Sequence, residues 1–203
     1  MHPTARWAVL IMILCLAACQ RPHPAPPSAQ DMAMGSPSAP VTVIEYASVA
    51  CPHCAQFHID VFPAFKARYI DTGKVRWILR EALTGDTALA AAGFLTAHCA
   101  GKDKYFSVVD DMFHAQAQMF ASGDPEPAML EIAGRAGLTP AQFQACIRDP
   151  AALAAIEARW REEERKEGVR QTPTFVINGR VYTGALTGPE LDSAVARAQG
   201  VKL

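Results

Sequence analysis

The chain has 203 residues, of which 50% are hydrophobic, and its 19 lysines and arginines nearly balance its 20 aspartates and glutamates. This composition suits a globular chain of one or two domains and excludes a disordered or collagen-like one. A formal net charge of −1 provides no basic surface for nucleic acid. No apolar run reaches the ~18 residues that a membrane-spanning helix needs.

Residues 1–18 have the pattern of a secretory signal peptide, because a basic start is followed by an uncharged apolar run from Trp7 to Ala18. Small residues precede Cys19, and this arrangement resembles the lipobox of bacterial lipoproteins. The resemblance implies cleavage before Cys19 and attachment of lipid to it. An ordinary signal peptide cut nearby and an uncleaved anchor are the alternatives. Gln20 follows the cysteine, which in proteobacterial lipoproteins favours sorting to the outer membrane.

Residues 19–40 are predicted to form a proline-rich tether. Six of the 21 residues from Gln20 to Pro40 are prolines, and such a stretch cannot form a helix. In an extended polyproline form it could reach roughly 65 Å. The tether would let a folded domain work at a distance from the membrane that anchors it.

The first part of the folded domain reads as a strand, a helix and a second strand. Residues 41–46 are β-branched and apolar, which predicts a buried strand. A helix over 51–70, bent at Pro63, is expected next. Residues 74–80 alternate apolar and polar side chains and predict a second strand. Such a unit places the two strands parallel, with a right-handed connection.

The middle of the chain carries clear helix signals. A helix over 87–100 stops at a glycine, and Asp124-Pro125 has the pattern of a helix start. Thr139-Pro140-Ala141-Gln142 has the spacing of a capping box. A last helix of this block opens at Asp149-Pro150 and ends at Gly168.

The end of the chain returns to strands. Residues 174–177 and 180–183 are predicted strands, and Asn178-Gly179 between them is the preferred pair for a two-residue hairpin turn. A final helix over 186–199 follows. The predicted order is therefore β-α-β, a helical block, and β-β-α.

The cysteines can be sorted by position. Cys15 leaves with the signal peptide, and Cys19 is the predicted lipid site. The four that remain, Cys51, Cys54, Cys99 and Cys146, would reside in an oxidising compartment and allow three pairings.

Cys51-Pro52-His53-Cys54 follows a predicted strand and opens a predicted helix. The positive end of the helix dipole favours a thiolate at Cys51, and a protonated His53 would add positive charge. Cys54 lies one turn further on and can close the disulfide. Half of a zinc site, completed by His53 or His58, is an alternative, and a purely structural bridge of this size would stabilise little.

Together with these cysteines, the segment from Thr172-Pro173 to Gly179 resembles the thioredoxin fold. The Pro-His pair between the cysteines resembles the DsbA family of disulfide oxidases, as does the helical block. The resemblance implies an α/β thioredoxin fold made of residues 41–84 and 169–203, with an inserted all-helical subdomain over 85–168.

The resemblance also implies roles for single residues. Cys51 matches the exposed nucleophile and Cys54 the buried cysteine. Pro173 matches a cis-proline beside the disulfide, and Thr172 matches the residue that contacts the active-site sulfurs. Glu45 matches a buried acid that could relay a proton to or from Cys54. A trans strand start at Pro173 and a surface position for Glu45 are the alternatives.

Two further features concern the surroundings of this site. His58 stands where the family has an acidic residue, and we expect it to be a solvated helix residue. Cys99 and Cys146 resemble a second disulfide that a subgroup of the family contains, which would brace the helical insertion. Two buried free thiols are the alternative.

The sequence thus predicts an exported, lipid-anchored thiol:disulfide oxidoreductase that oxidises cysteine pairs in other exported proteins. It would act as a monomer on the periplasmic side of a bacterial membrane, without metal or dissociable cofactor, and a DsbB-like membrane quinone reductase would reoxidise it. A reductase or isomerase on the same fold is one alternative. A copper or zinc carrier that uses Cys51, Cys54 and a histidine is another.

Overall fold

The computed structural model describes residues 26–28 and 30–200, so the predicted signal peptide and lipid site lie outside the described residues. A sheet of five strands in the order β1-β3-β2-β4-β5 forms the centre of this part of the chain. Strands β2 and β3 are parallel, whereas the other neighbours are antiparallel. The strands are β1 (Met32–Met34), β2 (Val41–Ala47), β3 (Val75–Glu81), β4 (Thr174–Ile177) and β5 (Arg180–Thr183).

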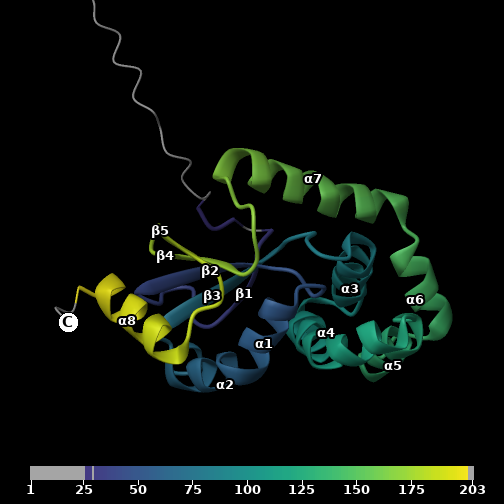
Figure 1. Ribbon diagram of the computed structural model, residues 1–203, viewed down its shortest axis with the longest axis horizontal. Coiled ribbons are helices and arrows are strands. Elements are labelled where there is room, and N and C mark those ends of the chain that lie inside the picture. Colours follow the sequence, from purple (N-terminus) through teal and green to yellow (C-terminus); the bar gives the residue numbers. More distant parts are fainter. Residues whose placement is uncertain (1–25, 29, 201–203) are drawn as a thin grey trace, which may run out of the picture.

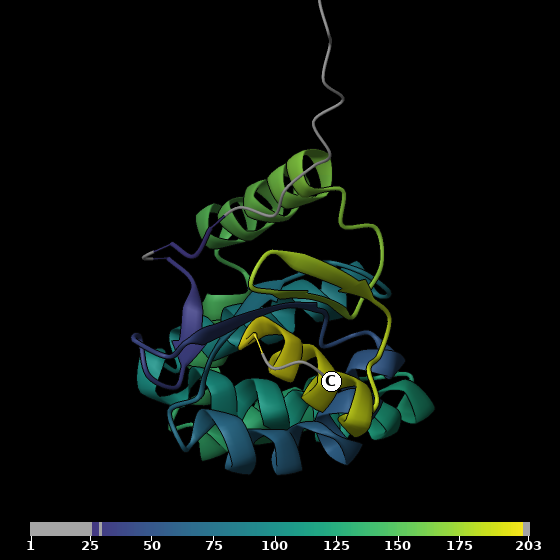
Figure 2. The ribbon, with the colours of Figure 1, turned by 90° about the vertical axis from the view of Figure 1, so that its left-hand side faces the viewer.

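Helices cover both faces of the sheet (Figure 1). On one face lie α1 (Pro52–Asp60), α2 (Phe62–Phe65), the π-helical turn η1 (Lys66–Ile70) and α8 (Gly188–Ala198). Across the other face runs α7 (Pro150–Glu167), as Figure 2 shows from the side. Beside the sheet are packed α3 (Thr87–Cys99), α4 (Lys102–Ser122), α5 (Glu126–Arg135) and α6 (Pro140–Ile147). Of the helices described, none is long and apolar enough to cross a membrane.

The central strand β2 is buried along almost its whole length, because its side chains meet helices on both faces of the sheet. On one face, Val43 belongs to an apolar cluster with Trp77 and Leu191 of α8. On the other face, Tyr46 belongs to a cluster with Trp160 of α7. The α/β fold with a helical insertion is thus confirmed.

Local sequence signals set most of the element boundaries. Thr139 and Gln142 form the expected capping box at the start of α6. Asn178 and Gly179 both have positive φ, 43° and 85°, which the predicted tight turn between β4 and β5 requires. The single bent helix expected over 51–70 instead divides, with α1 ending at Asp60 and the chain continuing as α2 and η1.

The prediction that residues 19–40 form a tether is wrong for the described end of that segment. Met32, Ala33 and Met34 form β1, which pairs with β3 at the sheet edge. Met32 packs against the apolar cluster of the helical insertion, and Met34 packs against the cluster that contains Trp77. The prolines of this segment exclude a helix, but residues 31–35 contain no proline and supply apolar side chains that pack at the sheet edge.

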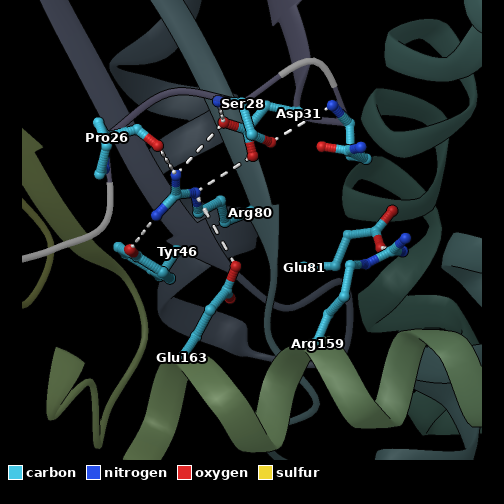
Figure 3. A network of polar contacts seen from close by, with 9 residues as sticks. Pro26, Ser28, Asp31, Tyr46, Arg80, Glu81, Arg159 and Glu163 are labelled. Atoms are coloured by element: carbon cyan, nitrogen blue, oxygen red, sulfur yellow. Dashed lines mark hydrogen bonds and ion pairs between the residues drawn. The ribbon is translucent and has the colours of Figure 1, made fainter. Parts of the chain in front are cut away.

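A buried guanidinium fastens this segment to the sheet (Figure 3). Arg80 is only 5% exposed and donates to the carboxylate of Asp31 at 3.2 Å and to the hydroxyl of Tyr46 at 2.7 Å. It also donates to the carbonyl oxygen of Pro26 at 3.0 Å and lies 3.9 Å from the Glu163 carboxylate of α7. Burial alone would lower the pKa of Arg80, but the contacts with Asp31 and Tyr46 outweigh it and raise the pKa. The side chain therefore stays charged and joins the N-terminal segment, the sheet and α7.

Replacing Arg80 with methionine should lower the free energy of unfolding by about 3–5 kcal/mol, because the largely buried carboxylates of Asp31 and Glu163 would lose their cation. Arg135→Met is the matched control, since Arg135 is half exposed and pairs with the surface residues Asp111 and Glu131. The control should lose no more than about 1 kcal/mol. Urea unfolding of both variants measures the difference, and equal losses would contradict the anchoring role of Arg80.

Candidate active site

Cys51 caps the N-terminus of α1, directly after the loop that leaves β2. Its backbone is extended, and its N–H donates to the carbonyl oxygen of Ser48 at 3.0 Å. Pro52 occupies the first turn of the helix, where an N–H would have no intrahelical partner. Both Cys51 and Cys54 are free thiols; Cys51 is 8% exposed and Cys54 is fully buried. The helix start therefore leaves one sulfur reachable and hides the other.

The pKa of Cys51 is lowered from 9.0 to about 5, chiefly by a hydrogen bond from the thiol of Cys54. Burial opposes this change, while Thr172 and the backbone N–H groups of Cys54 and His53 support it. The His53 side chain itself lies exposed on the helix surface. His53 thus contributes to the lowered pKa of Cys51 through its backbone N–H and not through its side chain.

The pKa of Cys54 moves in the opposite direction. Burial raises it well above the ordinary value, and the hydrogen bond to Cys51 and the negative charge of Glu45 raise it further. At neutral pH the reduced site therefore holds a thiolate at Cys51 and a thiol at Cys54. Two sulfurs in one helical turn thus differ strongly in acidity.

A second loop closes the site from the side of β4. The peptide bond between Thr172 and Pro173 is cis, and the Sγ of Cys51 lies 3.3 Å from the carbonyl oxygen of Thr172, which accepts a hydrogen bond from the protonated form of the thiol. The hydroxyls of Thr172 and Thr84 lie 2.7 Å apart, which joins this loop to the loop that follows β3. At Gly85, a Cβ would lie 2.7 Å from the carbonyl oxygen of Ala50, so only glycine allows this close approach.

A buried carboxylate and a buried imidazole lie beneath α1. Glu45 of β2 is fully buried and its Oε2 lies 2.9 Å from Nε2 of His58, which is 4% exposed. The expectation that His58 is solvated is therefore wrong. Cys54 and His58 are four residues apart, and this spacing places them on the same, buried face of the helix. That spacing could have revealed the position of His58 from the sequence.

Cys99 and Cys146 form a disulfide between α3 and α6. The bridge joins two helices of the insertion that are 47 residues apart. In the chain-entropy description a loop of this length stabilises the folded state by roughly 4 kcal/mol.

Within residues 26–28 and 30–200, no three His, Cys, Asp or Glu side chains are grouped to hold a metal ion.

Comparison with known proteins agrees with this geometry. A family model described as thioredoxin matches residues 28–197. A protein of Rickettsia conorii named as a protein-disulfide oxidoreductase is 30% identical over 169 residues, which cover 83% of this chain and 60% of the relative. Its counterpart in Rickettsia prowazekii is also 30% identical, with 61% of its length covered. The chain thus spans about three fifths of the length of these relatives.

Solved structures extend the comparison. The alpha-DsbA1 protein of Wolbachia pipientis superposes with a TM-score of 0.79 at 27% identity, covering 86% of this chain and 93% of that protein. Oxidised BdbD from Bacillus subtilis gives a TM-score of 0.70, covering 84% and 93% of the two chains, and at 18% identity this likeness concerns the fold alone. Together with the family match, these similarities show that the chain belongs to the thioredoxin family, in its DsbA branch.

Proposed function

We propose that this chain is a thiol:disulfide oxidoreductase that introduces disulfides into exported proteins. The observation that carries the proposal is the contrast between the two active-site thiols. Cys51 is reachable and has a pKa lowered to about 5, whereas Cys54 is buried and has a raised pKa. Such a pair donates its disulfide readily, because a thiol of low pKa is a good leaving group.

The exchange proceeds in two displacements. A substrate thiolate attacks the sulfur of Cys51; the Cys51–Cys54 bond breaks, and its electron pair passes to the sulfur of Cys54, which takes up a proton. A second substrate thiolate then attacks the substrate sulfur of the mixed disulfide, and Cys51 leaves as a thiolate. The substrate loses two electrons and gains a disulfide, while the Cys51–Cys54 pair is reduced. In this scheme Glu45 relays the proton of Cys54.

The lowered pKa of Cys51 also sets the direction of exchange. The folded reduced state gains stability from the thiolate above the ordinary thiol pKa of 9.0, and loses this gain as the pH falls towards about 5. The disulfide form has no thiolate and gains nothing. Between these pH values the reduced state is therefore favoured, which makes the disulfide oxidising.

The neighbouring loop supports binding of extended substrates. Pro173 has no N–H, and the carbonyl of Thr172 lies beside the Cys51 sulfur. Backbone contacts of this kind recognise a chain by its main chain rather than by its sequence, which fits a monomer acting on many exported proteins.

A DsbB-like membrane quinone reductase is the proposed reoxidant. A reductase or isomerase role would use the same fold but would require a pair that is held reduced.

We also propose that the protein is anchored by lipid on Cys19 at the periplasmic side of a membrane. Support comes from the small residues before Cys19 in the sequence. Because Pro26 already contacts Arg80 of the sheet, only six residues separate Cys19 from the docked segment. A span of this length reaches at most about 25 Å, so the domain would lie close to its membrane.

The redox assignment predicts that the oxidised protein restores disulfides to a reduced, unfolded substrate, and that Cys51→Ser abolishes this activity. The reduction potential of the Cys51–Cys54 pair, measured against glutathione, should lie well above the roughly −270 mV typical of thioredoxin. Cys99→Ala/Cys146→Ala is the control that keeps the active pair. A potential near that of thioredoxin would favour the reductase alternative.

The origin of the lowered Cys51 pKa predicts a contrast between two Cys54 variants. Cys54→Ser keeps a hydrogen-bond donor beside Cys51, so the thiolate should persist down to about pH 5. Cys54→Ala removes the donor, and the pKa of Cys51 should rise. Thiolate absorbance of the reduced proteins, titrated with acid, measures both values. Equal values for the two variants would contradict a dominant role for the hydrogen bond.

The anchoring proposal predicts that cells fed a radioactive lipid precursor label the wild-type protein but not Cys19→Ser. Cys15→Ser, four residues earlier in the apolar run, is the control and should be labelled normally. Labelling of the Cys19 variant, or its absence from the wild type, would remove the lipid anchor from the proposal.

A further inference from the structure

The exchange described above uses Glu45 but gives no role to His58, the buried residue that contacts Glu45 from the redox helix. Both side chains are almost completely shielded from solvent, and the 2.9 Å contact between Oε2 and Nε2 joins β2 to α1. Within the described residues, the other carboxylate oxygen, Oε1 of Glu45, has no hydrogen-bond partner. The imidazole thus fixes one oxygen of the carboxyl group, and the other oxygen is available for a hydrogen bond or a proton.

The fold holds the imidazole firmly in this place. Its ring stacks on Phe113 of α4, with centroids 4.2 Å apart and an angle of 19° between the planes. Phe62 of α2 contacts it at 4.6 Å, and Phe57 of α1 meets it edge-on at 5.5 Å. Aromatic side chains from three helices therefore surround His58, and its polar contact is with Glu45.

The other ionisable groups that face the pair belong to the redox site itself. Cys54 is on the same face of α1 as His58, and the charge of Glu45 raises the pKa of its thiol. Cys51 lies further along, at the N-terminus of the helix. From α4 the neighbour is Phe113, from α2 it is Phe62, and neither carries a charge.

We infer that His58 is a positioning residue for proton transfer to Cys54: it shares one proton with Glu45 across their hydrogen bond and fixes the carboxyl beneath the Cys54 sulfur. When a substrate thiolate opens the disulfide, the electron pair of the S–S bond passes to Cys54. The carboxyl then gives the shared proton to this sulfur, and the pair regains a proton from solvent as the substrate thiols ionise. When the disulfide forms again, Cys54 returns its proton by the same route.

The histidine matters because it offers the shared proton a second base beside the carboxylate. A single proton shared by a carboxylate and an imidazole leaves the buried site without net charge, which a low-dielectric environment favours. An imidazole ordinarily keeps its proton to a higher pH than a carboxyl does, about 6.5 against about 4.3. We therefore expect loss of the imidazole to slow proton delivery to Cys54 most at the alkaline end of the pH range. This inference rests on the proposed thiol–disulfide exchange.

The test is the single-turnover reduction of the Cys51–Cys54 disulfide by a small dithiol between about pH 5.5 and pH 8.5. Rates are expressed relative to wild type at each pH, so that ionisation of the dithiol cancels. His58→Gln keeps a polar group beside Glu45 but cannot hold the proton. Its relative rate should be within about twofold of wild type at the acid end and at least about tenfold lower at the alkaline end, a loss within the range of general acid catalysis.

Three further variants complete the experiment. His58→Phe keeps a ring against Phe113 and should show the same pH-dependent loss, so it decides the matter if His58→Gln fails to fold. Glu45→Gln should be slow at every pH, because the carboxyl that passes the proton to Cys54 is gone. His114→Gln is the matched control: His114 is an exposed histidine of α4, paired with Asp110, and the relative rate should stay near one throughout.

The outcomes separate the two proposals. A wild-type protein that exchanges no disulfide with the dithiol would overturn the proposed function itself. Exchange in the wild type, with relative rates of the His58 variants that are flat across the pH range, would leave that function standing and overturn the inference. A uniform slowing of those variants counts against it too, since a merely structural role for His58 predicts that pattern.

Discussion

The unequal burial of two sulfurs at the start of α1 is the constraint on which the rest of the structure depends. Cys51 must remain reachable while Cys54 is buried. Because the two cysteines share one helical turn, this difference in burial requires that the start of the helix is fixed in place. Strand β2 delivers the chain to that point, buried and paired on both sides. The loop at Pro173 then meets the Cys51 sulfur through Thr172, and Thr84, in the loop after β3, holds Thr172 in place.

The helical insertion contributes to this site as well as covering it. Gln116 of α4 donates to the carbonyl oxygen of Val49 at 2.7 Å, in the loop that leads to Cys51. Phe113 on the same helix stacks on His58. Because α4 packs against α3, which the disulfide at Cys99 joins to α6, the insertion forms a braced unit. Its rigidity would therefore help to fix the position of the first turn of α1.

At the opposite side of the sheet, the N-terminal segment shows how a buried charge can organise a surface. Arg80 is 5% exposed in β3, and its charge is tolerated because Asp31, Tyr46 and the carbonyl of Pro26 surround the guanidinium. A cavity of about 540 Å³ adjoins this network between β3 and α7. The charge thus holds the chain near its predicted anchor against the sheet edge, rather than leaving it as a spacer.

The sequence by itself determined the features that depend on neighbours along the chain. The redox cysteines at a helix start, the capping box at Thr139 and the turn at Asn178 follow from short-range hydrogen bonding and backbone geometry, which act over a few residues. Only the tertiary structure decided that the polar partner of His58 is Glu45, and that the segment around Asp31 docks on Arg80. These contacts join residues 13 and 49 positions apart. Such pairings depend on how the sheet and helices pack, and local propensity carries no information about that packing.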